Sequence, residues 1–64
     1  MPTGEVAFFD SEAGYGFVET DAADEDVFVH RSAVEGEDPT AGERVAFDLE
    51  QTADGPRARN LTRT

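Results

Sequence analysis

Two short stretches of the chain place flat side chains at every second position. Tyr15 and Phe17 stand in the first stretch, and Phe28 and His30 stand in the second. Side chains two residues apart lie on the same face of a β-strand, so each stretch would present two rings side by side. Exposed rings stack on planar partners, and unpaired nucleobases are planar partners that bind with little sequence preference. The spacing therefore predicts a site that works by stacking.

Strand signals recur along the chain, and the 3.6-residue periodicity of an amphipathic helix is missing. The expected strands are residues 5–9, 15–19, 26–30, 44–51 and about 57–62. Turn-prone residues separate them, which is typical of a small all-β domain. We therefore expect residues 1–64 to form a single domain, a five-stranded antiparallel barrel near the lower size limit for independent folding.

The register of the middle strands predicts which side chains face the solvent. Val27 and Val29 share one face of their strand, and Phe28 and His30 share the other. Valines are the natural core residues, so the rings should point outward. The same argument sends Tyr15 and Phe17 outward, opposite Gly16 and Val18. A contiguous apolar patch on a small domain usually marks a binding site.

The alternation of side chains does not fully decide which residues of the first and last strands face outward. Phe8 and Phe9 are neighbours, so only one of them can join the outward rings. In the last strand Ala58 and Leu61 break the period of two, so its faces stay unassigned. Between the third and fourth strands, residues 32–35 have the Ser-x-x-Glu form of a capping box, which predicts one short helical turn.

The charge of the chain is strongly negative. Fifteen acidic residues stand against five arginines, one histidine and no lysine, and the net charge is −10. Such a charge destabilises a compact state by self-repulsion, and about 1 M salt, with a Debye length of roughly 3 Å, removes most of that repulsion. We interpret the composition as that of a protein from a salt-rich cytoplasm. A GC-rich genome is the alternative; it would explain the missing lysine but not the excess of acid.

The acidic residues avoid both the ring stretches and the end of the chain. Residues 13–18 carry no charge, whereas acids crowd into residues 21–26 and 35–38. Residues 55–64 contain three arginines and no acid, a local charge of +3, and residues 1–54 contain fifteen acids and two arginines, a charge of −13. Two interpretations of the terminal arginines remain open: they face a negative partner, or they balance the acidic body.

The residue inventory argues against several other functions. His30 is the only histidine and has no evident catalytic partner, there is no cysteine, and Ser11 and Ser32 fit turn and cap positions. We therefore expect no enzyme and no cofactor. The acidic loop at 21–26 lacks the glycine and the distal glutamate of a calcium-binding loop, so we expect no metal site. Residues 1–10 lack the features of a signal peptide, and no stretch could span a membrane, so we expect a cytoplasmic protein.

These stretches resemble the cold-shock domain, a family of five-stranded OB-fold barrels that bind single-stranded RNA and DNA. Residues 14–18, GYGFV, are similar to its first ribonucleoprotein motif, and residues 27–30, VFVH, are similar to its second. The stretches at 4–6, 31–34 and 55–61 also fit, so the resemblance covers nearly the whole chain. The two motifs in this order and at this spacing are strongly specific.

The resemblance implies a set of binding residues, and it also shows departures from the family pattern. The implied and candidate contacts are Phe8, Phe9, Tyr15, Phe17, Asp26, Phe28 and His30, to which the charge argument adds Arg57 and Arg59. Ala7 and Ala13 stand where the family usually has lysines, and Phe8 replaces its tryptophan. Asp10 replaces an asparagine, and Arg31 takes a position that is often aromatic.

The function implied by the resemblance is that of an RNA chaperone. Such a protein, expected to be a monomer, holds single-stranded RNA or DNA by stacking and disfavours misfolded secondary structure. The alternative is an acidic protein-interaction module, or a nucleic-acid mimic, that uses the same face. The net charge favours that alternative, because nucleic-acid binders usually show a basic footprint.

Overall fold

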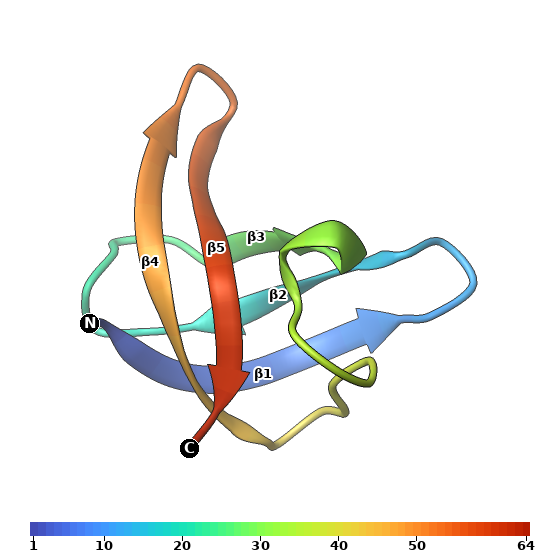
Figure 1. Cartoon of the computed structure of the whole chain (residues 1–64). Coiled ribbons are helices and arrows are strands. Elements are labelled where there is room, and N and C mark those ends of the chain that lie inside the picture. The colour runs from blue at the N-terminus through green and yellow to red at the C-terminus, as the bar shows by residue number, and fades with distance from the viewer.

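The computed structural model describes all residues from 1 to 64 and contains all five predicted strands (Figure 1). The elements are β1 (Thr3–Asp10), β2 (Tyr15–Glu19), β3 (Val27–His30), η1 (Arg31–Ala33), β4 (Arg44–Thr52) and β5 (Gly55–Arg63). Each observed strand lies within about two residues of its expected bounds. No helix in the structure has the length and apolar character needed to cross a bilayer.

The strands close into a barrel in the order β1-β2-β3-β5-β4, and β1 pairs with β4 to complete it. Four of the pairings are antiparallel, as predicted. The β3–β5 pairing is parallel, with Phe28 opposite Arg57, because the chain crosses the barrel end through η1 before it enters the β4–β5 hairpin. This hairpin extends beyond the body of the barrel, as Figure 1 shows. The predicted small five-stranded barrel is therefore confirmed, with one parallel pairing, and it is consistent with an OB-fold.

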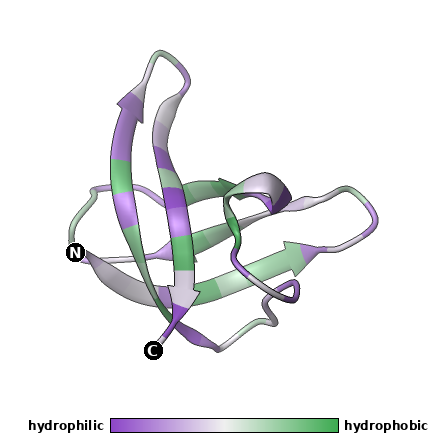
Figure 2. Ribbon diagram, in the orientation of Figure 1, coloured by the Kyte–Doolittle hydropathy of each residue, from purple (hydrophilic) through white to green (hydrophobic).

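The core is small and consists largely of valines. Its buried members are Val6, Val18, Val27, Val29, Val45, Phe47, Ala58 and Leu61. Hydrophobic and hydrophilic colouring alternates along β4 and β5, as expected for strands with one face inside (Figure 2). No polar or charged residue is buried, so the charge of the chain lies entirely on the surface.

A β-bulge at Ala7 decides which phenylalanine of β1 faces outward. Val6 pairs with Val18, but Phe8 pairs with Phe17, so β1 contains one residue more than β2 between these pairs. A bulge adds an unpaired residue and reverses the alternation beyond it. Phe8 therefore leaves the face of buried Val6 and joins the outer face.

A second irregularity resolves the faces of β5. Ala46 pairs with Thr62 and Asp48 pairs with Arg59, so β5 has an extra residue there. Asn60 adopts a φ of 52°, a left-handed conformation that asparagine tolerates well. The extra residue leaves the side chains on both sides of the bulge, at 58 and 61, pointing into the core.

Gly16 permits close packing of β1 against β2. A Cβ atom at this position would overlap the carbonyl oxygen of Phe8 and would lie 2.8 Å from both the Cα atom and a ring carbon of Phe9. Phe9 consequently covers the inner side of Gly16 and packs against the core cluster. The absent side chain at 16 is what allows β1 and the Phe9 ring to approach this closely.

The predicted short helical turn exists, but the predicted capping box is wrong. The turn η1 begins at Arg31, and its N-cap is His30, whose ring accepts a hydrogen bond from the Ser32 N–H. Ser32 lies inside the turn and cannot cap it. The Glu35 N–H donates instead to the Leu61 carbonyl at 3.0 Å, which ties the exit of the turn to β5. The N-cap is His30 rather than Ser32 because β3 continues to His30 and the turn begins directly after it.

Arg63 fastens the loop between η1 and β4. Its guanidinium donates to Glu43 Oε1 at 2.8 Å and to the carbonyl oxygens of Glu37 and Asp38 at 2.8 and 3.1 Å. The Thr40 N–H donates to the other Glu43 oxygen at 2.7 Å. The Thr40 hydrogen bond, and after it the Arg63 contact, hold the pKa of Glu43 below its usual value of 4.5.

The lowered pKa of Glu43 predicts a pH-dependent contribution to stability. A carboxylate with a depressed folded pKa stabilises the fold fully above its unfolded pKa and loses that contribution as pH falls through the folded value. The wild type should therefore exceed Glu43→Gln in unfolding free energy by a constant margin above pH 4.5 and by a shrinking margin below it. Urea unfolding followed by circular dichroism at fixed KCl measures this margin. Glu12→Gln is the control, because the Glu12 carboxylate has no hydrogen-bond or ion-pair partner. A margin that stays constant through acid pH would contradict the assignment.

The surface charge predicts that salt stabilises the fold. Screening removes repulsion among the acidic residues, so the thermal midpoint should rise as KCl approaches the molar range. Circular dichroism melts over a KCl series test this expectation. A variant with Asp21→Asn, Asp24→Asn and Glu25→Gln should depend less on salt than the wild type. Equal stability in dilute buffer and in molar KCl would remove the inference of a salt-adapted protein.

Candidate nucleic-acid interface

The outward rings form a row across three strands of the barrel. Phe8 of β1 pairs with Phe17 of β2, Phe17 pairs with Phe28 of β3, and Phe28 pairs with Arg57 of β5. Residues that pair across neighbouring strands lie on the same face and within contact distance. The barrel register therefore turns residues far apart in the sequence into one line of three rings ended by a guanidinium group.

A second, shorter row runs beside the first. Tyr15 pairs with His30 on one side and with Asp10 on the other. Tyr15 thus stands next to the three phenylalanines. We call the four rings of Phe8, Tyr15, Phe17 and Phe28 the ring platform.

The rings of the platform touch one another in a continuous cluster. The centroid distances are 6.2 Å for Phe8–Tyr15, 5.6 Å for Phe8–Phe17, 6.2 Å for Tyr15–Phe17, 5.8 Å for Tyr15–Phe28 and 5.9 Å for Phe17–Phe28. The Tyr15 and Phe28 rings are nearly parallel, and most other pairs meet edge to face. Such contacts stabilise aromatic pairs and fix the orientation of each ring.

The platform is accessible from solvent. Phe8 is 43% exposed, and the other three rings are half-buried. The valines of β2 and β3 alternate with these rings and are fully buried beneath them. The prediction that valines point inward and rings outward is confirmed, and Phe8 rather than Phe9 joins the outer face.

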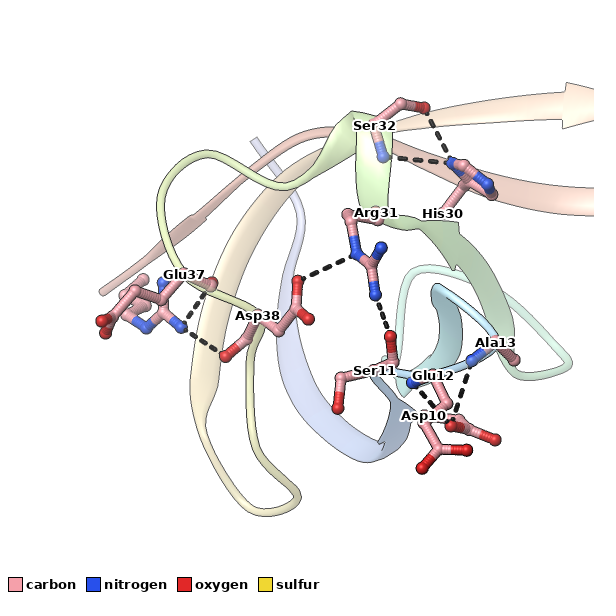
Figure 3. A network of polar contacts seen from close by, with 10 residues as sticks. Asp10, Ser11, Glu12, Ala13, His30, Arg31, Ser32, Glu37 and Asp38 are labelled. Atoms are coloured by element: carbon pink, nitrogen blue, oxygen red, sulfur yellow. Dashed lines mark hydrogen bonds and ion pairs between the residues drawn. The ribbon is translucent and has the colours of Figure 1, made fainter.

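His30 is held in a fixed orientation by the residues of η1. Its Nδ1 atom accepts a hydrogen bond from the Ser32 N–H at 3.1 Å and lies 2.9 Å from Ser32 Oγ (Figure 3). Because Nδ1 accepts the backbone N–H, we assign the proton of the neutral ring to Nε2. The ring edge with Nε2 then presents a hydrogen-bond donor beside Tyr15, at the end of the second row.

Arg31 connects the two loops beside His30. Its Nε atom lies 3.5 Å from Asp38 Oδ1, and its Nη2 atom donates to the carbonyl oxygen of Ser11 (Figure 3). Asp10 accepts from the N–H groups of Glu12 and Ala13 at 3.0 and 3.2 Å and so closes the β1–β2 turn. The side chain of Arg31 is thus engaged in holding loops.

A group of acidic residues surrounds a hollow in the barrel surface. A hollow of about 440 Å³ is lined by the start of β1, the end of β2 and the loop at 20–26. Six of its lining residues are acidic, among them Asp26, and Arg44 is its only basic one. No ring of the platform lines it, but Glu19 and Asp26 in its wall are two residues from Phe17 and Phe28, so the hollow adjoins one end of the ring surface.

The structure brings together only some of the residues predicted from the sequence. Phe8, Tyr15, Phe17, Phe28, His30 and Arg57 lie in the two paired rows. Phe9 packs against the core on the inner side of β1, Asp26 lines the acidic hollow, and Arg59 pairs with Glu50 at 3.3 Å. Phe9 thus lies on the face opposite the rings, whereas Asp26 and Arg59 flank the row, two residues along the chain from Phe28 and Arg57.

Sequence reasoning did not identify two residues that shape the site. Ser32 is predicted to cap the helical turn, but in the structure it holds the His30 ring. The sequence signal for this contact is a serine two residues after an outward-facing histidine. Ala7 was not expected to bulge, and the adjacent phenylalanines at 8 and 9 were the only sign that the alternation changes there.

Comparison with known proteins agrees with this geometry. Residues 2–64 match the model of the family described as the "'Cold-shock' DNA-binding domain". The chain belongs to the cold-shock domain family. It is 44% identical to the cold shock-like protein CspLB of Listeria monocytogenes, with 98% of each chain covered. It is 38% identical to the cold shock protein CspD of Bacillus subtilis and to the cold shock protein ScoF of Streptomyces coelicolor, with 98% and 97% of each chain covered, respectively.

Family membership confirms the resemblance found in the sequence and the nucleic-acid-binding function that it implied. The ribonucleoprotein-like motifs correspond to β2 and β3, the two strands that carry most of the ring platform. The alternative, an acidic interaction module or nucleic-acid mimic, is not favoured by this membership.

Proposed function

We propose that this cold-shock domain binds single-stranded RNA or DNA by stacking unpaired bases on the ring platform. The observation that carries the proposal is the contiguous outward cluster of four rings across β1, β2 and β3. His30 extends the surface with a fixed ring and a free Nε2 donor. Phe9 is left out of the proposed contacts because it packs against the core, whereas Asp26, two residues before Phe28, is kept as a proposed hydrogen-bonding contact.

The energetics of stacking are sufficient for useful affinity. Stacking on an aromatic side chain contributes roughly 1–3 kcal/mol per base, so three or four bases supply on the order of 3–12 kcal/mol before ordering costs. Micromolar binding needs about 8 kcal/mol. We therefore expect weak-to-moderate binding with little sequence preference.

The absence of basic residues around most of the platform suits a salt-rich cytoplasm. β1, β2 and β3 contain no arginine or lysine. Contacts between cations and phosphates gain free energy by releasing counterions, and this gain falls steeply as salt rises. Stacking, in contrast, does not depend on releasing ions. A platform that works mainly through rings loses little affinity at molar salt.

The consequence of such binding is an RNA chaperone that works without a catalytic step. A protein that binds only the unpaired form shifts the pairing equilibrium toward that form by mass action. Weak affinity serves this role, because the protein must also release the strand. We propose that residues 1–64 act in this way as one domain, as a monomer in the cytoplasm.

Fluorescence of Tyr15 tests the proposal directly. Tyr15 is the only tyrosine, there is no tryptophan, and its ring lies within the platform. Adding oligothymidine or oligouridine in molar KCl should quench this fluorescence. Phe17→Ala and Phe28→Ala should each weaken binding by about 5- to 150-fold, the factor expected for one lost stacking contact.

Phe9→Leu is the matched control. It also removes an aromatic ring, but from the inner side of β1, so binding should change little under conditions where the variant is folded. Circular dichroism establishes folding for each variant. If no single strand binds at any salt concentration where the wild type is folded, the stacking proposal is wrong and the mimic alternative gains support.

A further inference from the structure

The arginines of β5 differ in what holds them. Arg63 is fixed by Glu43 and two loop carbonyls, and Arg59 lies 3.3 Å from Glu50. Arg57 makes no ion pair and no side-chain hydrogen bond, although its backbone is opposite Glu50 in the β4–β5 register. The balancing role predicted as one alternative therefore applies to two of these three arginines and leaves Arg57 available.

Arg57 also occupies a particular place beside the ring platform. It is the residue of β5 that pairs with Phe28, so it continues the row of rings. It is the only basic residue in that row, since the first 30 residues of the chain contain no arginine or lysine. A strand whose base stacks on Phe28 would bring its backbone close to this guanidinium group.

Two hollows meet at Arg57. One, of about 210 Å³, lies between Phe28 and the tip of the β4–β5 hairpin. The other, of about 140 Å³, is lined by Ser32 and Ala33 of η1 and by Arg57, Arg59 and Asn60 of β5. The first has a ring in its wall, and the second has two guanidinium groups, a hydroxyl and an amide. The two guanidinium groups of the second hollow suit an oxyanion, whereas its hydroxyl lies against His30 Nδ1 and its amide donates to Asp48.

The carboxylates near this second hollow are already engaged. Asp48 accepts a hydrogen bond from Asn60 Nδ2 at 2.9 Å, and Glu50 is paired with Arg59. The Arg59–Glu50 pair is exposed, with side-chain exposures of 61% and 40%, and exposed pairs of this kind are weak and easily exchanged. Arg59 can therefore turn toward a phosphate, while Arg57 needs to break no pair at all.

We infer that Arg57, with Arg59 beside it, binds a phosphodiester group of the strand whose base stacks on Phe28. A guanidinium fork matches two phosphate oxygens, which makes arginine well suited to this contact. The inference rests on the proposed stacking function and adds its phosphate subsite. It places the electrostatic contact on β5, at the end of the platform opposite β1.

The test compares two single-charge variants over a KCl series. Arg57→Gln removes the proposed contact, and Arg44→Gln removes an equally unpaired arginine that lines the acidic hollow. The affinity for oligothymidine is measured by Tyr15 fluorescence. For Arg57→Gln, the slope of log K against log salt should become shallower by about 0.7, the value for one phosphate contact on a single strand. The affinity of the wild type relative to that of Arg57→Gln should therefore change about fivefold over a tenfold change in salt. Arg57→Lys should keep most of the slope, and Arg44→Gln should match the wild type.

A strand with neutral methylphosphonate linkages identifies the group that Arg57 contacts. On that strand the wild type and Arg57→Gln should bind equally. An unchanged slope for Arg57→Gln, an equal loss for Arg44→Gln, or a persistent difference on the neutral strand would each overturn the phosphate subsite. These outcomes leave the stacking proposal standing, whereas an absence of any strand binding to the folded wild type overturns both.

Discussion

The alternation of side chains on β2 and β3 is the constraint on which the rest of the molecule depends. It sends the valines into a core of only eight residues and the rings to the other side of the same strands. The core and the site are therefore two faces of one structure, and the register that buries Val18 and Val27 also aligns Phe17 with Phe28. A slip of one residue would exchange the two faces and destroy both. The bulge at Ala7 extends this alignment to β1 and adds Phe8 to the platform.

The distribution of charge complements this division. No charged group is buried, and the acids concentrate in the loop at 20–26 and around the hollow that it lines. Several of the remaining carboxylates have structural roles: Asp10 closes a turn, and Asp38 and Glu43 hold arginines. No acid stands between the rings of the platform in a chain of net charge −10, and Asp10 and Glu19 lie only at its edges, beside Tyr15 and Phe17. Affinity can then come from contacts that salt does not weaken.

The sequence was sufficient to predict the features that local periodicity determines. The strands, the inward valines and the outward rings at 15, 17 and 28 all follow from a period of two, which short-range sterics impose. The bulges at Ala7 and Asn60 could not be predicted, because they depend on the register of a partner strand. The cap of η1 was wrongly assigned to Ser32, since the pattern of a capping box does not reveal where the preceding strand ends. Arg59 and Arg63 have acidic or carbonyl partners and Arg57 has none. This difference could not be predicted either, because the partners lie 9 to 26 positions away in the sequence.

The central claim is that bases lie on the outer rings of the barrel. Chemical-shift mapping by nuclear magnetic resonance, with a short oligothymidine in molar KCl, tests it most directly. The account predicts that the ring protons of Phe8, Tyr15, Phe17 and Phe28 shift together and show intermolecular contacts to thymine protons. A strand that binds while these ring signals stay unchanged, with its effects confined to the loops, would contradict it.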